Sequence, residues 1–141
     1  MYFEFERLDV YQVSVDFVVL ADAITEAFPR GRAYLKDQIR RAANSIPAHI
    51  AEGVGEFAPN DKSRFYRIAR RSAVECASHL LVCQRLTLVK ESQLLKGREL
   101  LLRLGAMLTS MTQSVGSRQR HNRPAGNGNG NGNGVCLGSG S

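Results

Sequence analysis

The sequence predicts an all-α protein whose first part, residues 1–116, folds as an up-and-down antiparallel four-helix bundle. Apolar residues recur three, four or seven positions apart in four long segments, which stacks them on one face of each helix. Only short stretches with Pro, Gly or Asn separate the segments, so consecutive helices should run antiparallel. No segment of this part alternates between apolar and polar residues as a half-buried strand does.

The first helix is predicted over residues 8–28 and the second over about residues 32–53. Their apolar stripes are Val10, Val13, Phe17, Leu20, Ile24 and Phe28, and then Leu35, Ile39, Ala42, Ile46 and Ile50. Pro29 and Gly31 end the first helix, because proline cannot continue the hydrogen-bond ladder and glycine permits the turn. Pro47 lies inside the second pattern and predicts a kink near residues 43–47.

The third helix is predicted from an N-cap at Asn60 or Asp61 to about Val89, and the fourth over about residues 92–115. Their stripes are Phe65, Ala69, Ser72, Cys76, Leu80 and Cys83, and then Leu94, Leu101, Leu104, Leu108 and Met111. Residues 117–141 are basic and then rich in Asn and Gly. They have no apolar surface to offset the entropy of ordering, so we expect a flexible tail.

The composition excludes several classes of protein. No apolar run approaches the ~20 residues of a membrane-spanning helix, so no membrane association is expected. The acidic, aromatic N-terminus does not resemble a signal peptide. Three unevenly spaced cysteines cannot form a disulfide framework and suit a reducing compartment, so we expect a cytoplasmic protein.

The positive charge is concentrated in the second half of the chain. Residues 1–60 carry six Lys and Arg against nine Asp and Glu, whereas residues 61–141 carry thirteen against four. The overall charge of +6 and a pI near 9.7 favour a polyanionic partner, most often a nucleic acid. Solubility alone is the competing explanation for such a charge.

The predicted third helix carries a row of arginines opposite its apolar stripe. At 100° per residue, Arg64, Arg67, Arg71 and Arg85 fall within about 60° of one another, with Arg70 beside them. The row is ~32 Å long, and guanidinium groups match phosphate oxygens, so it predicts a nucleic-acid contact. A solvated helix face is the alternative. In the tail, Arg118, Arg120 and Arg123 could add salt-sensitive phosphate contacts.

The residues that could support catalysis are few, so we expect no enzyme, no catalytic residues, no metal and no cofactor. Two pairs of residues have spacings that could place them on one helix face: His49 with Glu52, and Glu75 with His79. A di-iron bundle needs Glu-x-x-His on two helices and further inward carboxylates, which the other two predicted helices lack. A metal-dependent bundle enzyme therefore remains only a distant alternative. Cys76 and Cys83 lie on the apolar stripe and are predicted as core residues.

Three segments resemble a known family, in the right order and spacing. They are FERLDVYQ at residues 5–12, QIRRAANSIP at 38–47 followed by IAEG at 50–53, and FYRIAR at 65–70. Together they resemble the four-helix-bundle family of 23S rRNA intervening-sequence proteins, over roughly residues 3–115. That family includes the accessory variability determinants (Avd) of diversity-generating retroelements. Two departures stand out, since the family usually has Asn at the position of His49 and often Gly at that of Arg71.

The resemblance implies a barrel-like homopentamer. In the retroelement branch, it implies a basic outer surface that binds template RNA, or RNA–DNA, and a reverse transcriptase during mutagenic copying. It assigns that surface to Arg64, Arg67, Arg70 and Arg71, while the Arg40–Arg41 pair is either part of it or a structural element. Retroelement templates are rich in Asn codons and can adjoin the accessory gene, so the Asn-rich end favours this branch, although out-of-frame sequence would explain it equally. An intervening-sequence protein with a ribosome-linked role is the alternative.

Overall fold

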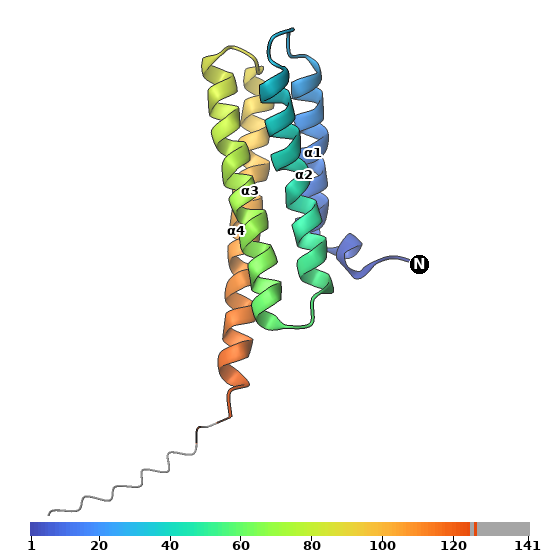
Figure 1. Cartoon of the computed structure of the whole chain (residues 1–141), viewed down its shortest axis with the longest axis vertical. Coiled ribbons are helices and arrows are strands. Elements are labelled where there is room, and N and C mark those ends of the chain that lie inside the picture. The colour runs from blue at the N-terminus through green and yellow to red at the C-terminus, as the bar shows by residue number, and fades with distance from the viewer. Residues whose placement is uncertain (125, 127–141) are drawn as a thin grey trace, which may run out of the picture.

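The computed structural model describes residues 1–124 and 126 and confirms an all-α four-helix bundle in this part of the chain. Its elements are η1 (Glu4–Arg7, a short 3₁₀ helix), α1 (Asp9–Glu26), α2 (Ala33–Gly55), α3 (Pro59–Arg85) and α4 (Glu91–His121). The four α-helices run antiparallel, each packs against the next, and α1 closes the bundle against α4 (Figure 1). The Asn–Gly repeats of the predicted tail lie outside the described residues.

The core is built from one apolar face of each helix, largely as the periodicity predicts. Phe17, Ile46, Leu80 and Leu104 are among its fully buried side chains. The exceptions lie at the edges of the stripes, where Leu20, Phe28 and Met111 are only partly buried. On α3 the buried aromatic ring is Tyr66, whereas Phe65, which was predicted for the stripe, is half-buried.

Several helix boundaries differ from the predicted ones, and the predicted N-cap at Asn60 or Asp61 is wrong, because Ala58 is the N-cap and α3 begins at Pro59. α3 ends at Arg85 rather than near residue 89, because Thr87 adopts a left-handed backbone conformation with φ 60°. The Leu88 N–H then donates to the Cys83 carbonyl over 2.8 Å and turns the chain into α4. In α2 the helix continues through Pro47 to Gly55, since Ile46 and Ile50 on either side are fully buried in the core.

α4 extends six residues beyond its predicted end and reaches His121. The helix therefore continues past residue 116, where the boundary between bundle and tail was predicted, and Arg118 and Arg120 are helical residues. In Figure 1 this end of α4 projects past the other helices. The Gln119 side-chain amide donates to Asn60 Oδ1 over 3.0 Å, so the basic end of α4 lies beside the start of α3.

The cysteines of α3 behave as core residues, as predicted. Cys76 and Cys83 are buried and have free thiols. Burial, reinforced by the nearby charge of Glu75, raises the pKa of Cys76 to about 12, and burial also raises the pKa of Cys83. Both groups are therefore neutral thiols at physiological pH, which suits apolar packing rather than nucleophilic chemistry.

Glycine allows the closest approach between α2 and α3. A Cβ added at Gly53 would lie 2.6 Å from Tyr66 Cε1 and 3.2 Å from Phe65 Cβ. Because the Tyr66 ring is buried, it has little room to move away. The glycine in the IAEG segment is therefore required by packing at the end of α2 nearest to the α2–α3 loop.

Replacing Gly53 with Ala should lower the free energy of unfolding by about 1–3 kcal/mol, because the new methyl group overlaps a buried ring. Gly116→Ala in α4 is the matched control, since nothing lies within 4 Å of its added Cβ. That substitution should raise stability by up to ~1 kcal/mol through helix propensity. Urea unfolding followed by circular dichroism measures both, and equal effects would contradict the close approach at Gly53.

Candidate nucleic-acid interface

The outward face of α3 carries a line of exposed guanidinium groups, which we call the outer arginine row: Arg64, Arg67, Arg71 and Arg85. The buried residues of the same helix, such as Ala69, Cys76 and Leu80, occupy its opposite face. Because the apolar face must enter the core, the row points to solvent along most of the helix. Among the described residues, none of the four forms an ion pair with a carboxylate.

One member of the row is positioned by an aromatic stack. The Arg64 guanidinium carbon lies 4.9 Å from the centre of the Phe65 ring. On α2, the His49 ring stacks on the same phenyl group with 6.1 Å between ring centres. Phe65 therefore lies between two cationic or polar side chains and serves as a support for Arg64.

A polar groove between α2 and α3 lies next to the row. It has a volume of about 410 Å³, and its lining includes Gln38, Arg41, Ser45, Ser72, Glu75 and His79. Ser45 Oγ lies 2.9 Å from Ser72 Oγ and 3.0 Å from His49 Nδ1, so a hydroxyl chain joins the two helices. Arg41 lines this groove and is exposed. Ser45, Ser72 and His79 were not predicted as site residues, although the serine at position 72 on the apolar stripe of α3 was a visible signal.

Arg40 has a different environment from its neighbour and joins α1 to α2. Its Nη2 atom lies 3.0 Å from Asp22 Oδ1 and 2.8 Å from Glu26 Oε2, while its Nε–H donates to Thr25 Oγ1 over 3.0 Å. The hydrogen bond from Arg40, followed by the charge of Lys36, lowers the pKa of Glu26. Because the Arg40 donors are directed at these groups, Arg40 fits the interpretation as a structural element rather than as part of a nucleic-acid surface.

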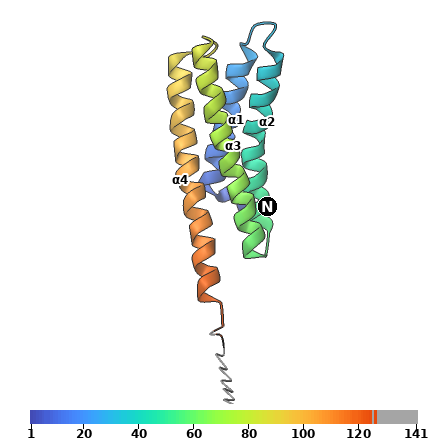
Figure 2. The same ribbon diagram turned by 60° about the vertical axis from the view of Figure 1, so that its left-hand side comes forward.

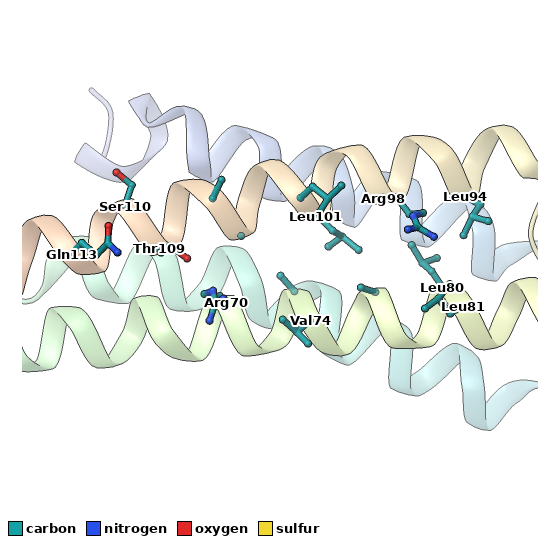
Figure 3. A pocket seen from close by; sticks show the side chains of 15 residues that line it. Arg70, Val74, Leu80, Leu81, Leu94, Arg98, Leu101, Thr109, Ser110 and Gln113 are labelled. Carbon is teal, nitrogen blue, oxygen red and sulfur yellow. The ribbon is translucent and has the colours of Figure 1, made fainter.

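Arg70 lies apart from the row and faces α4. α3 lies between α2 on one side and α4 on the other (Figure 2), so its outward face borders a groove on each side. Arg70 lines the α3/α4 groove together with Arg98 of α4 (Figure 3). Arg98 was not predicted as a site residue, because its presence on the same groove as Arg70 depends on how the two helices pack.

The basic end of α4 extends the positive surface. Arg118, Arg120 and Arg123 are exposed, and the contact between Gln119 and Asn60 places this end beside the first turn of α3. Arg64 follows one turn later on α3. The end of α4 therefore brings further arginines beside the start of the outer arginine row, where Asp61 is the acidic residue of the first turn.

The histidine–glutamate pairs do not assemble a metal centre. His79 Nε2 lies 3.4 Å from Glu75 Oε1, whereas His49 Nδ1 contacts Ser45. Within residues 1–124 and 126, no three His, Cys, Asp or Glu side chains are grouped as metal ligands would be. None of the helices in this part has an apolar stretch long enough to cross a bilayer.

A comparison with protein families finds one match over most of this bundle. The model of the family described as 23S rRNA-intervening sequence protein matches residues 6–110. The match contains α1, α2 and α3 and most of α4, and it includes the whole outer arginine row. No curated protein matches the chain.

Arg40→Ala should lower the melting temperature by a few degrees, because it removes the contacts that join α1 to α2. Arg41→Ala is the matched control and should leave it nearly unchanged, since Arg41 is exposed. Because the pKa of Glu26 is lowered, its ionised carboxylate stabilises the folded state through Arg40 at pH values above the ordinary carboxyl pKa. This contribution to stability is lost as the pH falls through the lowered pKa.

The difference between the wild-type and Arg40→Ala proteins should therefore shrink in acid. Thermal unfolding at neutral pH and at about pH 3 measures it, because most carboxylates are protonated at the lower value. A difference of the same size at both pH values would contradict an electrostatic role for Arg40.

Proposed function

The chain belongs to the 23S rRNA-intervening sequence protein family, and from this premise we propose that it binds RNA through the outer arginine row. The observation that carries the proposal is the set of four exposed guanidinium groups on one helix face without carboxylate partners among the described residues. Phosphate contacts by such groups release counterions from the nucleic acid, which drives binding at low salt. The protein acts by binding and needs no catalytic residues of its own.

The polar α2/α3 groove supports RNA as the ligand class. The partly exposed hydroxyl group of Ser45 and the guanidinium of Arg41 lie beside the row, where they can bond to sugar hydroxyls while the row contacts phosphates. Proteins distinguish RNA from DNA by such contacts with the 2′-hydroxyl group. RNA, or an RNA–DNA hybrid during copying, is the proposed ligand.

The proposed active form is a homo-oligomer, and the family resemblance indicates a barrel-like homopentamer. Support comes from large apolar side chains that stay exposed on α3 and α4, including Val74, Leu81, Leu95 and Leu102. Exposed apolar groups clustered on one face are typical of protein–protein contact sites. A ring of subunits would also repeat the outer arginine row around its circumference and so raise the avidity for a long RNA.

Within the family, we propose the accessory role in a diversity-generating retroelement, in which the partner reverse transcriptase supplies the chemistry and this protein holds the template RNA. The competing function is a ribosome-linked one, which the family description itself favours because it names 23S rRNA. The two functions require the same basic surface and differ in the RNA that occupies it.

Reversing the charge in the middle of the row, with Arg67→Glu and Arg71→Glu together, should weaken RNA binding about tenfold or more at low salt. The slope of log K against log salt should fall in magnitude by about 1–2, because about two phosphate contacts are lost. Gel-shift titrations at several salt concentrations measure both quantities.

The matched control is Lys96→Glu with Arg103→Glu, which changes the net charge equally on α4, away from the row. This control should retain most of the affinity and nearly the wild-type salt slope. Equal losses in the two double variants would mean that net charge, rather than the row, determines binding.

Crosslinking the protein to RNA in its host cells, followed by purification and sequencing, should identify the bound RNA. We expect template RNA of a retroelement together with a co-purified reverse transcriptase. Recovery of 23S rRNA without a reverse transcriptase would reject the retroelement role and favour the ribosome-linked one. The Arg67→Glu/Arg71→Glu protein is the control, because specific recovery of either RNA should depend on the row.

A further inference from the structure

α3 and α4 enclose an apolar groove on the surface of the bundle (Figure 3), with a volume of about 560 Å³. Its floor consists of small and buried residues, among them Ala73, Ala77 and Leu101. Two larger residues on its rim stay in solvent, since Val74 is 61% exposed and Leu102 is 72% exposed. A single copy of the chain leaves this apolar surface uncovered, so covering it would be favourable.

The charges on the groove have one sign. The charged side chains that line it are Arg70 on α3 and Arg98 on α4, and no acidic side chain is among the described lining residues. In Figure 3 these two arginines lie toward opposite ends of the groove. An occupant that complements the groove must therefore present apolar side chains together with carboxylates.

The N-terminal arm of the chain, residues 1–6, has this composition. Tyr2 and Phe3 are 70% and 71% exposed, and Glu4 and Glu6 supply two carboxylates, while the guanidinium carbon of the following residue, Arg7, lies 5.8 Å from the centre of the Tyr2 ring. The arm is partly ordered before any contact, because the Phe3 N–H donates to Glu6 Oε1 over 3.0 Å and the Phe3 and Phe5 rings stack with centres 5.5 Å apart. An ordered arm loses less conformational entropy on binding than a mobile one.

The arm is directed away from the groove of its own chain. η1 packs against α1 and α2, and Phe5 is held on Tyr11 with 4.8 Å between ring centres. The Gln12 side-chain amide also donates to the Glu6 carbonyl oxygen over 2.8 Å. In Figure 1 the N-terminus projects sideways from the bundle, so a second copy of the chain is the nearest source of a matching groove.

We propose that the N-terminal arm of one copy packs into the α3/α4 groove of the next copy. Tyr2 and Phe3 cover Val74 and Leu102, while the Glu4 carboxylate faces one of the two groove arginines. This contact joins two different surfaces, so it is heterologous and repeats from copy to copy until the ring closes. It rests on the homo-oligomer proposed above and specifies the contact that holds it together.

The experiment measures the mass of the native particle for three variants of the full chain at one concentration. The arm variant carries Tyr2→Ser and Phe3→Ser, and the groove variant carries Val74→Asp and Leu102→Asp. Both should fall from the oligomer to the monomer mass of 15.5 kDa. Phe57→Ser is the matched control, because this ring is 99% exposed but lies between α2 and α3, and it should keep the wild-type mass.

Mixing the two defective variants tests the direction of the contact. The arm variant keeps an intact groove and the groove variant keeps an intact arm, so one productive contact can form between them. The mixture should give a heterodimer of twice the monomer mass and nothing larger. A mixture that stays monomeric would overturn the proposal, since an arm seated in its own groove or a symmetric groove-to-groove contact predicts no such dimer.

Other results separate this inference from the proposals on which it builds. An arm variant that keeps the wild-type mass overturns the arm–groove contact but leaves the homo-oligomer intact. A wild-type protein that is monomeric overturns the contact and the homo-oligomer together. Neither result tests whether the outer arginine row contacts RNA, which the gel shifts measure separately.

Discussion

The burial of one apolar face from each of four helices is the constraint on which the rest of this structure depends. Phe17, Ile46, Leu80 and Leu104 come from different helices and are all fully buried in one core. Once these faces meet, the rotation of every helix about its axis is set, because side chains on a helix have fixed angular positions. The outward direction of the outer arginine row is a consequence of this packing, and the Phe65 ring adds a support for Arg64.

The same constraint determines which arginines have a carboxylate partner among the described residues. On α1 and α2, Asp22 and Glu26 bind Arg40, so that positive charge is balanced within the bundle. On α3 the row has no such partners among the described residues, and its field extends into solvent. Positive charge without a nearby partner attracts a polyanion, whereas paired charge mainly orients helices. Net charge alone would not distinguish these two cases.

Helix packing also creates the grooves that border α3, and here the prediction from sequence was incomplete. Arg70 is adjacent to the row on a helical wheel, but the approach of α4 places it with Arg98 on an apolar groove. Ser45 and Ser72 are far apart in the chain, yet their hydroxyl oxygens lie 2.9 Å apart across α2 and α3. Periodicity within one helix contains no information about the rotation of its neighbour, so such pairs were not predicted.

The sequence by itself determined the fold class, the four amphipathic helices, most of the core and the exposed face of α3, because these follow from the spacing of apolar residues along each helix. Only the tertiary structure decided that Arg40 is paired, that Arg70 faces a groove and that α4 continues to His121. The physical reason is the same for all three. Each depends on contacts between residues of different helices, as the bond from Gln119 to Asn60 shows, and no local pattern encodes those distances.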